Sequence, residues 1–127
     1  MVSDAASPAD PSERIDVMTT AETFRDRVLA RLSGLGEVTS RPLFGGHGLY
    51  WRGTIIAITY SGKLYLKVDE GSQGDYLTRG MGPFRPNERQ TIKSYYEVPP
   101  EVLADPEALL SWAGEAVRAG QVSQGRV

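Results

Sequence analysis

The chain has 127 residues, of which 40% are hydrophobic and 24% charged, and this length and balance suit one globular domain. Its lack of cysteine and its single histidine exclude disulfides, thiolate chemistry, cysteine-based zinc or iron–sulfur sites and a histidine-rich metal site. A formal net charge of −2 argues against direct nucleic-acid binding, because such proteins neutralise many phosphates with basic side chains.

The start of the chain, residues 1–18, is predicted to be a disordered tail because it has prolines and acids but no apolar period. It also lacks a basic start followed by an apolar core, so it is not a secretory signal. No apolar run is long enough for a transmembrane helix. We therefore expect a cytoplasmic, bacterial-type protein with one domain over residues 19–120 and a second disordered tail over residues 121–127.

The first ordered element is predicted to be a helix that begins near Thr19. Thr19 and Glu22 are spaced as a capping box, in which a hydroxyl and a carboxylate satisfy free backbone N–H groups. Gly34 and Gly36 are expected to end this helix. One face is apolar at helical spacing and consists of Ala21, Phe24, Val28 and Leu32.

An antiparallel β-meander is predicted for the middle of the chain. Its runs of β-forming residues are joined by Arg52-Gly53 and Ser61-Gly62, and two-residue links that end in glycine are typical of tight hairpins. Pro42 places the first strand at an edge, or marks the end of that strand. The four predicted strands cover Glu37–Phe44, Gly48–Trp51, Thr54–Tyr60 and Lys63–Val68.

Two of these strands indicate which faces are buried. Ile55–Ile58 is apolar on both faces, so we expect its strand at the centre of the sheet. The next strand, Lys63–Val68, alternates between two kinds of side chain. Its leucines and valine should face the core, while Lys63, Tyr65 and Lys67 share the opposite face.

Residues 69–80 are predicted to form a weak helix, because Asp69 or Ser72 can cap it and two glycines weaken it. Residues 80–84 are predicted to form a loop. The final strand is expected over residues 91–98, with adjacent tyrosines on opposite faces.

The dipeptide Pro99-Pro100 is expected to break this strand, and the last helix should run from Pro106 to Gly120 with Asp105 as its cap. Trp112 lies in the apolar stripe of that helix and is expected in the core. The predicted fold class is α+β, an antiparallel β-meander with helices packed on it in the order α-β-β-β-β-α-β-α.

The segment Gly45-Gly46-His47-Gly48 holds three glycines and the only histidine, and two interpretations of it stay open. The glycines indicate either a structural corner or bulge, or a place where a ligand docks. A phosphate-binding loop is disfavoured because the segment runs into a strand and not into a helix. For His47 the alternatives are a general base or ligand, and a turn residue that hydrogen-bonds its own backbone.

Basic and aromatic side chains supply a candidate binding surface. Lys63, Tyr65 and Lys67 form either a stacking platform for single-stranded nucleic acid or an ordinary sheet face, solvated or partly covered by a helix, and the acidic composition favours the second. Tyr95 and Tyr96 are either contacts of a partner surface or core side chains. No residue is assigned to catalysis, a cofactor or a metal. The candidate binding surface consists of Arg41, Gly45, Gly46, His47, Gly48, Lys63, Tyr65, Lys67, Tyr95 and Tyr96.

Four segments of the chain together resemble the N-terminal domain of the TfoX/Sxy family. They occur in the order of the family and with similar spacing, over roughly residues 20–119. Leu43 stands where the family more often has methionine, a change that conserves volume. The segments are Arg41–Tyr50, Leu64–Asp69, Ser94–Pro99 and Trp112-Ala113.

The resemblance implies a role in gene regulation. Two-domain members of the family regulate natural competence genes, in concert with the cyclic-AMP receptor protein at promoters, and carry a second, helical C-terminal domain. We expect this chain to be a stand-alone single-domain member without that second domain. It is accordingly expected to be a non-enzymatic regulatory or adaptor module with a protein partner, no cofactor, no membrane contact, and a monomeric or homodimeric state.

Two alternative functions remain open at this point. One is a small-ligand-binding domain or minor enzyme that uses the Gly45–Gly48 segment with His47. The other is weak nucleic-acid binding through Lys63, Tyr65 and Lys67.

Overall fold

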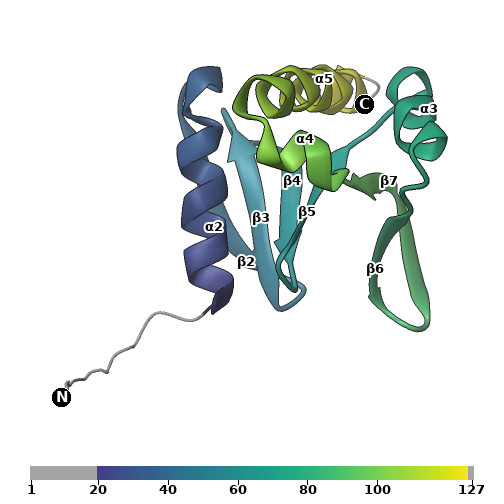
Figure 1. Cartoon of the computed structure of the whole chain (residues 1–127), viewed down its shortest axis with the longest axis horizontal. Helices are drawn as coiled ribbons and strands as arrows, with labels where there is room; N and C mark the ends of the chain where they lie inside the picture. The colour runs from purple at the N-terminus through teal and green to yellow at the C-terminus, as the bar shows by residue number, and fades with distance from the viewer. Residues whose placement is uncertain (1–19, 126–127) are drawn as a thin grey trace, which may run out of the picture.

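A six-stranded antiparallel sheet forms the centre of the fold, which the computed structural model describes for residues 20–125 (Figure 1). The predicted α+β class is confirmed. The helices are α2 (Thr20–Arg31), the 3₁₀ turn η1 (Ser33–Leu35), α3 (Glu70–Thr78), α4 (Pro100–Ala104) and α5 (Pro106–Gly125). The strands are β2 (Val38–Leu43), β3 (Gly46–Trp51), β4 (Thr54–Tyr60), β5 (Lys63–Lys67), β6 (Pro83–Asn87) and β7 (Gln90–Glu97). The predicted tail over residues 1–18 and the predicted cap Thr19 lie outside the described residues.

The strands are ordered β2-β3-β4-β5-β7-β6 across the sheet, so β4 is central and β2 and β6 are the edges. Both placements follow from the sequence. The strand with Ile56, Ala57 and Ile58 is buried on both faces, as its apolar run predicted. The strand with Pro42 is an edge, where a residue without an N–H does not interrupt a second ladder.

Three two-residue turns connect the first four strands. The predicted turns are confirmed, because both residues of Arg52-Gly53 and of Ser61-Gly62 have positive φ, as a type I′ hairpin requires. The turn between β2 and β3 has the same form, with φ of 56° at Phe44 and 87° at Gly45. Strand β3 therefore begins at Gly46 and not at Gly48, where the sequence predicted its start.

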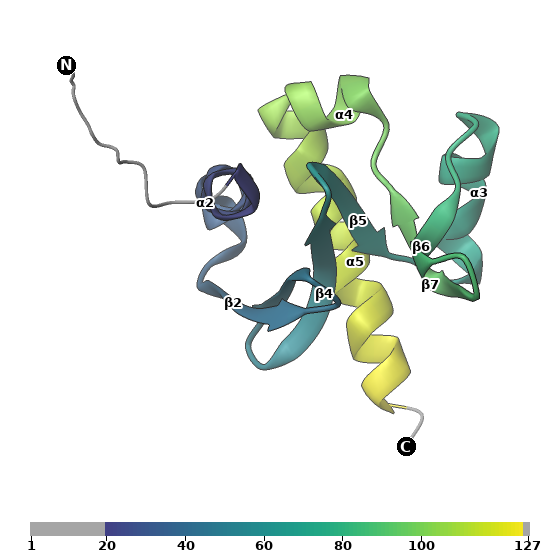
Figure 2. The same cartoon turned by 90° about the horizontal axis from the view of Figure 1, so that it is seen from below.

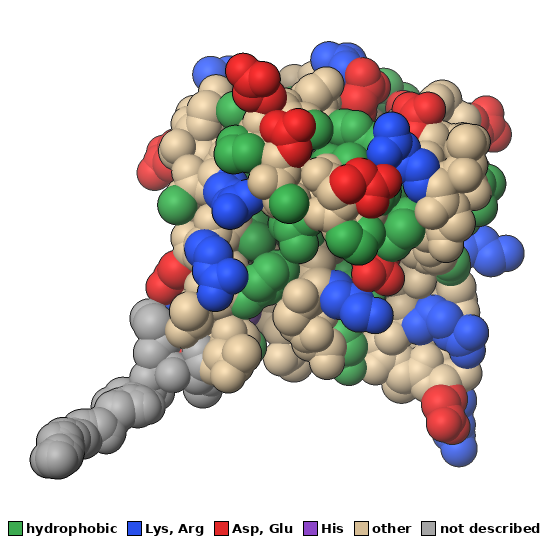
Figure 3. Space-filling model, in the orientation of Figure 1, with side chains coloured by type: hydrophobic (Ala, Val, Ile, Leu, Met, Phe, Trp, Pro, Cys, Tyr) green, Lys and Arg blue, Asp and Glu red, His purple; other side chains and the backbone are tan. Residues whose placement is uncertain are grey.

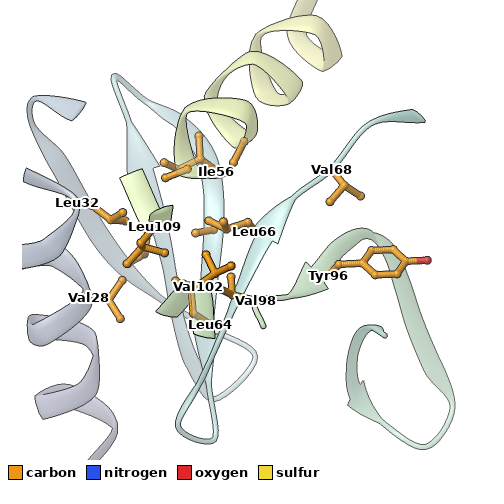
Figure 4. Packing of buried hydrophobic residues seen from close by; sticks show 14 of the residues in the cluster. Val28, Leu32, Ile56, Leu64, Leu66, Val68, Tyr96, Val98, Val102 and Leu109 are labelled. Atoms are coloured by element: carbon orange, nitrogen blue, oxygen red, sulfur yellow. The ribbon is translucent and has the colours of Figure 1, made fainter. Parts of the chain in front are cut away.

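All four helices pack on one face of the sheet, over a helix-side core. Figure 4 shows Val28 and Leu32 of α2 directed toward the strands, next to Leu109 of α5. Leu64 and Leu66 of β5 point toward this core, as the alternation of that strand predicted. The other buried members of this core are Leu49, Ile56, Ala57, Val68, Tyr76, Tyr96, Val98, Val102, Ala113 and Ala116.

The opposite face carries a strand-side core, which consists of Ile58, Tyr65, Phe84 and Tyr95. Phe84 of edge strand β6 lies 4.8 Å from Tyr65 and 5.6 Å from Phe44, between ring centroids. The Tyr60 hydroxyl also donates to the Pro86 carbonyl at 3.0 Å. Since β6 is the far edge from the β2–β3 turn, these contacts require the sheet to curl, and Figure 2 shows that curvature from below.

Two predictions about elements in the second half are wrong, and one helix was missed. Residues 83–87, assigned in part to a loop, form edge strand β6, so two strands follow α3 and not one. The predicted end of the strand before Pro99-Pro100 is confirmed, since β7 ends at Glu97, but Pro100 also starts α4, a helix that the sequence did not predict. Helix α5 does not end at Gly120 but continues to Gly125.

The remaining caps agree with the sequence. Asp69 accepts from the Ser72 amide at 2.9 Å and the Ser72 hydroxyl accepts from the Asp69 amide at 3.1 Å, a reciprocal capping box that starts α3. Asp105 accepts from the Glu107 and Ala108 amides at the start of α5. Within the described part of the chain, no helix has the length and apolarity needed to cross a membrane.

Candidate functional site

The residues of the predicted candidate binding surface do not share one surface. Gly46 and Gly48 are buried in strand β3, and His47 between them faces α2. Tyr65 and Tyr95 are 8% and 6% exposed in the strand-side core, while Tyr96 is 5% exposed in the helix-side core. Arg41 and Lys63 remain at the surface. The structure therefore separates the predicted set into buried and exposed parts.

Gly46 and Gly48 lie in strand β3 at points where neighbouring atoms leave no room for a side chain. A Cβ atom on Gly46 would lie 2.0 Å from the Thr59 carbonyl oxygen of β4. A Cβ atom on Gly48 would lie 3.1 Å from both Ile55 and Leu43 side chains. The predicted corner is limited to the Phe44-Gly45 turn, and the irregularity in strand pairing falls later, between Leu49 and Tyr50.

His47 contacts another element and not its own turn, so the turn-residue interpretation is wrong. Its Nε2 atom lies 3.3 Å from the Arg25 guanidinium of α2. Arginine has only donors, so Nε2 must accept, and a neutral ring then carries its proton on Nδ1. This contact links α2 to β3 and uses the ring nitrogen that a general base would need.

Two polar atoms near this contact are buried without a hydrogen-bond partner among the described residues. They are Nδ1 of His47 and Oγ1 of Thr59. These residues pair directly across β3 and β4, and Thr59 is only 2% exposed. Such atoms carry a desolvation cost that a hydrogen bond would offset. The small-ligand hypothesis for this segment stays a prediction, because nothing in the described residues assigns a ligand to these atoms.

The predicted stacking platform on β5 is covered at its centre. The Phe84 ring packs against Tyr65 at a tilt of 52°, and Tyr65 is only 8% exposed, so its ring is not open for a base to stack on. Lys63 lies 3.8 Å from the Glu97 carboxylate, and the Lys67 ammonium lies 4.9 Å from the centre of the Tyr95 ring. Burial lowers the pKa of Lys67. The alternative, a sheet face that is solvated or partly covered by a helix, differs from the structure in what covers the face, because Phe84 of strand β6 packs on Tyr65 in the strand-side core.

The tyrosines are core side chains with polar ends. Burial, together with the neighbouring Tyr50, raises the pKa of Tyr95 to about 12. The hydroxyl of Tyr96 accepts from the Gln73 side chain at 2.8 Å. Trp112, expected in the core, is half-buried against it and packs on Tyr76 with ring centroids 4.7 Å apart. These contacts favour the core interpretation of Tyr95 and Tyr96 over a partner surface.

A groove of about 220 Å³ lies between α2 and α4, and we call it the α2–α4 groove. Its apolar side chains come from α2 and from α4. Figure 3 shows hydrophobic side chains gathered between these two helices. The lining residues are Phe24, Arg27, Val28, Arg31, Pro100, Leu103 and Ala104.

Two arginines of α2 give this groove a positive rim. Arg31 donates to the Leu103 carbonyl of α4 at 2.8 Å, which holds the two helices together. Arg27 is exposed, and its guanidinium has no hydrogen bond or ion pair with a described residue. The groove can therefore accept apolar side chains on its floor and a carboxylate at its rim.

The α2–α4 groove was missed at the sequence level because α4 was missed. Phe24 and Val28 were assigned to a buried helix face, and one wall of the groove consists of a helix where the sequence predicted only the end of a strand. The available signal was Pro100 itself, since proline is favoured in the first turn of a helix.

A second cleft, of about 340 Å³, lies between the start of α3 and the end of α5. It mixes the Lys67 ammonium with the Asp69 and Glu70 carboxylates and the apolar Val122 side chain. This mixture of charges selects no ligand class. No group of three or more metal-ligating side chains occurs in residues 20–125.

Comparison with known protein families identifies a similarity. A family model described as the TfoX N-terminal domain matches residues 30–120, which covers the whole sheet and all of α3 and α4. A search of curated proteins finds no match.

Proposed function

Because the chain belongs to the TfoX N-terminal domain family, we propose that it is a non-enzymatic regulatory or adaptor module of transcription. It acts through protein–protein contacts. The observation that carries this proposal is the α2–α4 groove, which is apolar, open and rimmed by Arg27.

The chemistry of the α2–α4 groove suits a peptide segment of a partner. A helix or strand that carries apolar side chains could bury them against Phe24 and Leu103, as in other groove-binding modes. A carboxylate on the same segment would pair with the Arg27 guanidinium, which has no partner among the described residues. This ion pair would orient the bound segment and raise its association rate more than it would raise its affinity for the groove.

The geometry around His47 supports the non-enzymatic part of the proposal. Its Nε2 atom faces the Arg25 guanidinium, which is neither a nucleophile nor a carboxylate that could orient the ring for proton transfer. The bound arginine instead gives His47 a role in holding α2 on the sheet.

The proposal is tested with two charge reversals at exposed positions. Arg27→Glu changes the rim of the α2–α4 groove, and Lys93→Glu makes the same change on β7, away from the groove. Proteins captured from the native lysate by the immobilised chain are identified, purified and titrated against both variants. We expect Arg27→Glu to weaken binding of one such protein about tenfold, while Lys93→Glu has no effect.

A cellular measurement separates regulation from simple binding. Deletion of the gene should change the transcript levels of a defined gene set. Arg27→Glu should reproduce that change and Lys93→Glu should not. Equal behaviour of the two variants in both measurements would contradict the proposal.

A further inference from the structure

The α2–α4 groove has a candidate occupant in the chain itself, the N-terminal segment of residues 1–19, which precedes α2 and lies outside the described residues. We propose that this segment docks in cis into the α2–α4 groove and occupies it until a protein partner displaces it. The inference rests on the proposed function of the groove and adds the regulation of that site.

Charge distinguishes the N-terminal segment from the rest of the chain. Its ionisable side chains are four carboxylates and one guanidinium, a net charge of −3, from Asp4, Asp10, Glu13, Asp16 and Arg14. The whole chain has a charge of −2, so residues 20–127 have a net charge of +1. An acidic segment that comes within a Debye length of about 8 Å of Arg27, whose guanidinium has no partner among the described residues, is attracted to it.

The part of the segment nearest to α2 also carries apolar side chains. In an extended conformation, Ile15 and Val17 lie on one side and Asp16 on the other. The two apolar side chains then match the floor of the α2–α4 groove. Asp16 matches its arginine rim. This is the combination of apolar and acidic groups that the groove selects.

The distances allow this contact. Arg27 is seven residues into α2 from Thr20, so it lies roughly 10 Å along the helix axis at 1.5 Å per residue. Residues 15–19 span up to about 17 Å when extended, at some 3.4 Å per residue. A segment that reverses direction at the start of α2 therefore has the length to reach the groove.

Tethering makes a weak contact sufficient. A short flexible linker gives an effective concentration in the millimolar range. A segment that binds in trans with a Kd of about 1 mM would then fill roughly half of the grooves in cis. Such an occupant stays displaceable by a partner of micromolar affinity, as a regulator of access requires.

The test uses the absence of native cysteine, because an introduced pair then reports one contact without background. Val17→Cys is combined with Ala104→Cys, an exposed position in the groove. In the matched control, Val17→Cys is combined with Glu88→Cys in the β6–β7 turn, which Figure 1 places far from α2. In a glutathione buffer, the groove pair should form its intramolecular disulfide about tenfold faster than the control pair.

A charge swap tests the role of the rim in the same full-length chain. Adding Arg27→Glu to the groove pair should slow disulfide formation roughly threefold, and adding Asp16→Arg to that variant should restore the rate. Equal rates for the groove and control pairs, or disulfides that form only between two chains, would overturn docking in cis.

These outcomes are distinct from those of the proposed function. If Arg27→Glu weakens partner binding but the cysteine pairs react equally, the partner site stands and the cis segment is refuted. If the groove pair reacts faster and the charge swap restores the rate, the cis segment is supported even where no partner responds to Arg27→Glu.

Discussion

Thr59 is a buried side chain whose hydroxyl has no hydrogen-bond partner in the described part of the chain. Because the hydroxyl lost its water on folding, removing it should help the folded state. We expect Thr59→Val, which keeps the shape of the side chain, to raise the free energy of unfolding by about 1 kcal/mol. Urea denaturation measures this change. Thr39→Val on exposed β2 is the control and should stay within about 0.5 kcal/mol.

A lower stability of Thr59→Val would mean that Oγ1 has a partner, most simply an ordered water shared with His47 Nδ1. That outcome would also turn the pair of polar atoms into evidence for a hydrated site beneath α2.

At this residue scale the sequence predicted backbone geometry better than side-chain partners. Arg52-Gly53 and Ser61-Gly62 were predicted as turns because local chemistry determines a hairpin turn. The contact between His47 and Arg25 joins positions 22 residues apart, and no local pattern encodes it. The glycines beside His47 were recognised as special, but their reason lies in the Thr59 carbonyl on a neighbouring strand.

Two glycines of α5 illustrate how an element depends on what it packs against. A Cβ atom on Gly120 would lie 2.9 Å from Thr54 Cγ2 and 3.5 Å from the Ile55 carbonyl, while a Cβ atom on Gly114 would meet nothing within 4 Å. We expect Gly114→Ala to stabilise the chain by about 1 kcal/mol through helix propensity. Gly120→Ala should destabilise it by about 1–3 kcal/mol through overpacking.

Thermal or urea unfolding of the two variants measures this difference, and each serves as the control for the other. Equal stabilisation by both would show that α5 does not press on β4 at Gly120.

The same close approach of α5 to β4 explains why the end of α5 was predicted incorrectly. From the sequence, a glycine near the end of an apolar stripe indicates the end of a helix. Gly120 instead lies inside α5, where its lack of a side chain leaves room for strand β4.

The cap of α3 gives a pH-dependent prediction. The hydrogen bond from the Ser72 amide holds the pKa of Asp69 below its ordinary value. This stabilisation is therefore complete above the unfolded pKa of about 4 and is lost as pH falls through the lowered folded value. We expect Asp69→Ala to cost about 1 kcal/mol at neutral pH and less in acid.

Urea unfolding at pH 7 and at pH 3 measures this effect. Asp75→Ala on the exposed side of the same helix is the control and should change stability little. Asp69→Asn keeps the cap and should remove its pH dependence. A cost of Asp69→Ala that is unchanged between the two pH values would contradict the role of the carboxylate.

The missed elements have a common physical reason. Strand β6 has two prolines in five residues, and α4 begins with a Pro99-Pro100 pair. Proline opposes a central strand and a helix interior but is accepted on an edge strand and in a first helical turn. Which of these applies depends on position in the sheet, which the local sequence does not contain.

The curl of the whole sheet depends on contacts between strands that are not neighbours. Tyr60 donates to the Pro86 carbonyl across this curvature. We expect Tyr60→Phe to cost about 1 kcal/mol and to speed amide hydrogen exchange mainly in the β6–β7 hairpin, because that hairpin loses its tie to β4. Tyr50→Phe is the control, since no described residue bonds its hydroxyl.

If amide hydrogen exchange in the β6–β7 hairpin were as slow in Tyr60→Phe as in the unsubstituted chain, the aromatic contacts alone would hold the hairpin. At this scale the class and the central strand were predictable, because apolar periodicity reports burial on one or both faces. The curl and the α2–α4 groove were not, since each depends on two elements distant in sequence.

The prolines on both edges of the sheet also bear on how copies of this chain behave when crowded. An exposed edge strand is a template on which a second chain can add its own strand, the first step of fibril growth. Pro42 on β2, and Pro83 and Pro86 on β6, remove donors from the two templates that the sheet exposes. The fold thus resists self-assembly through its strands.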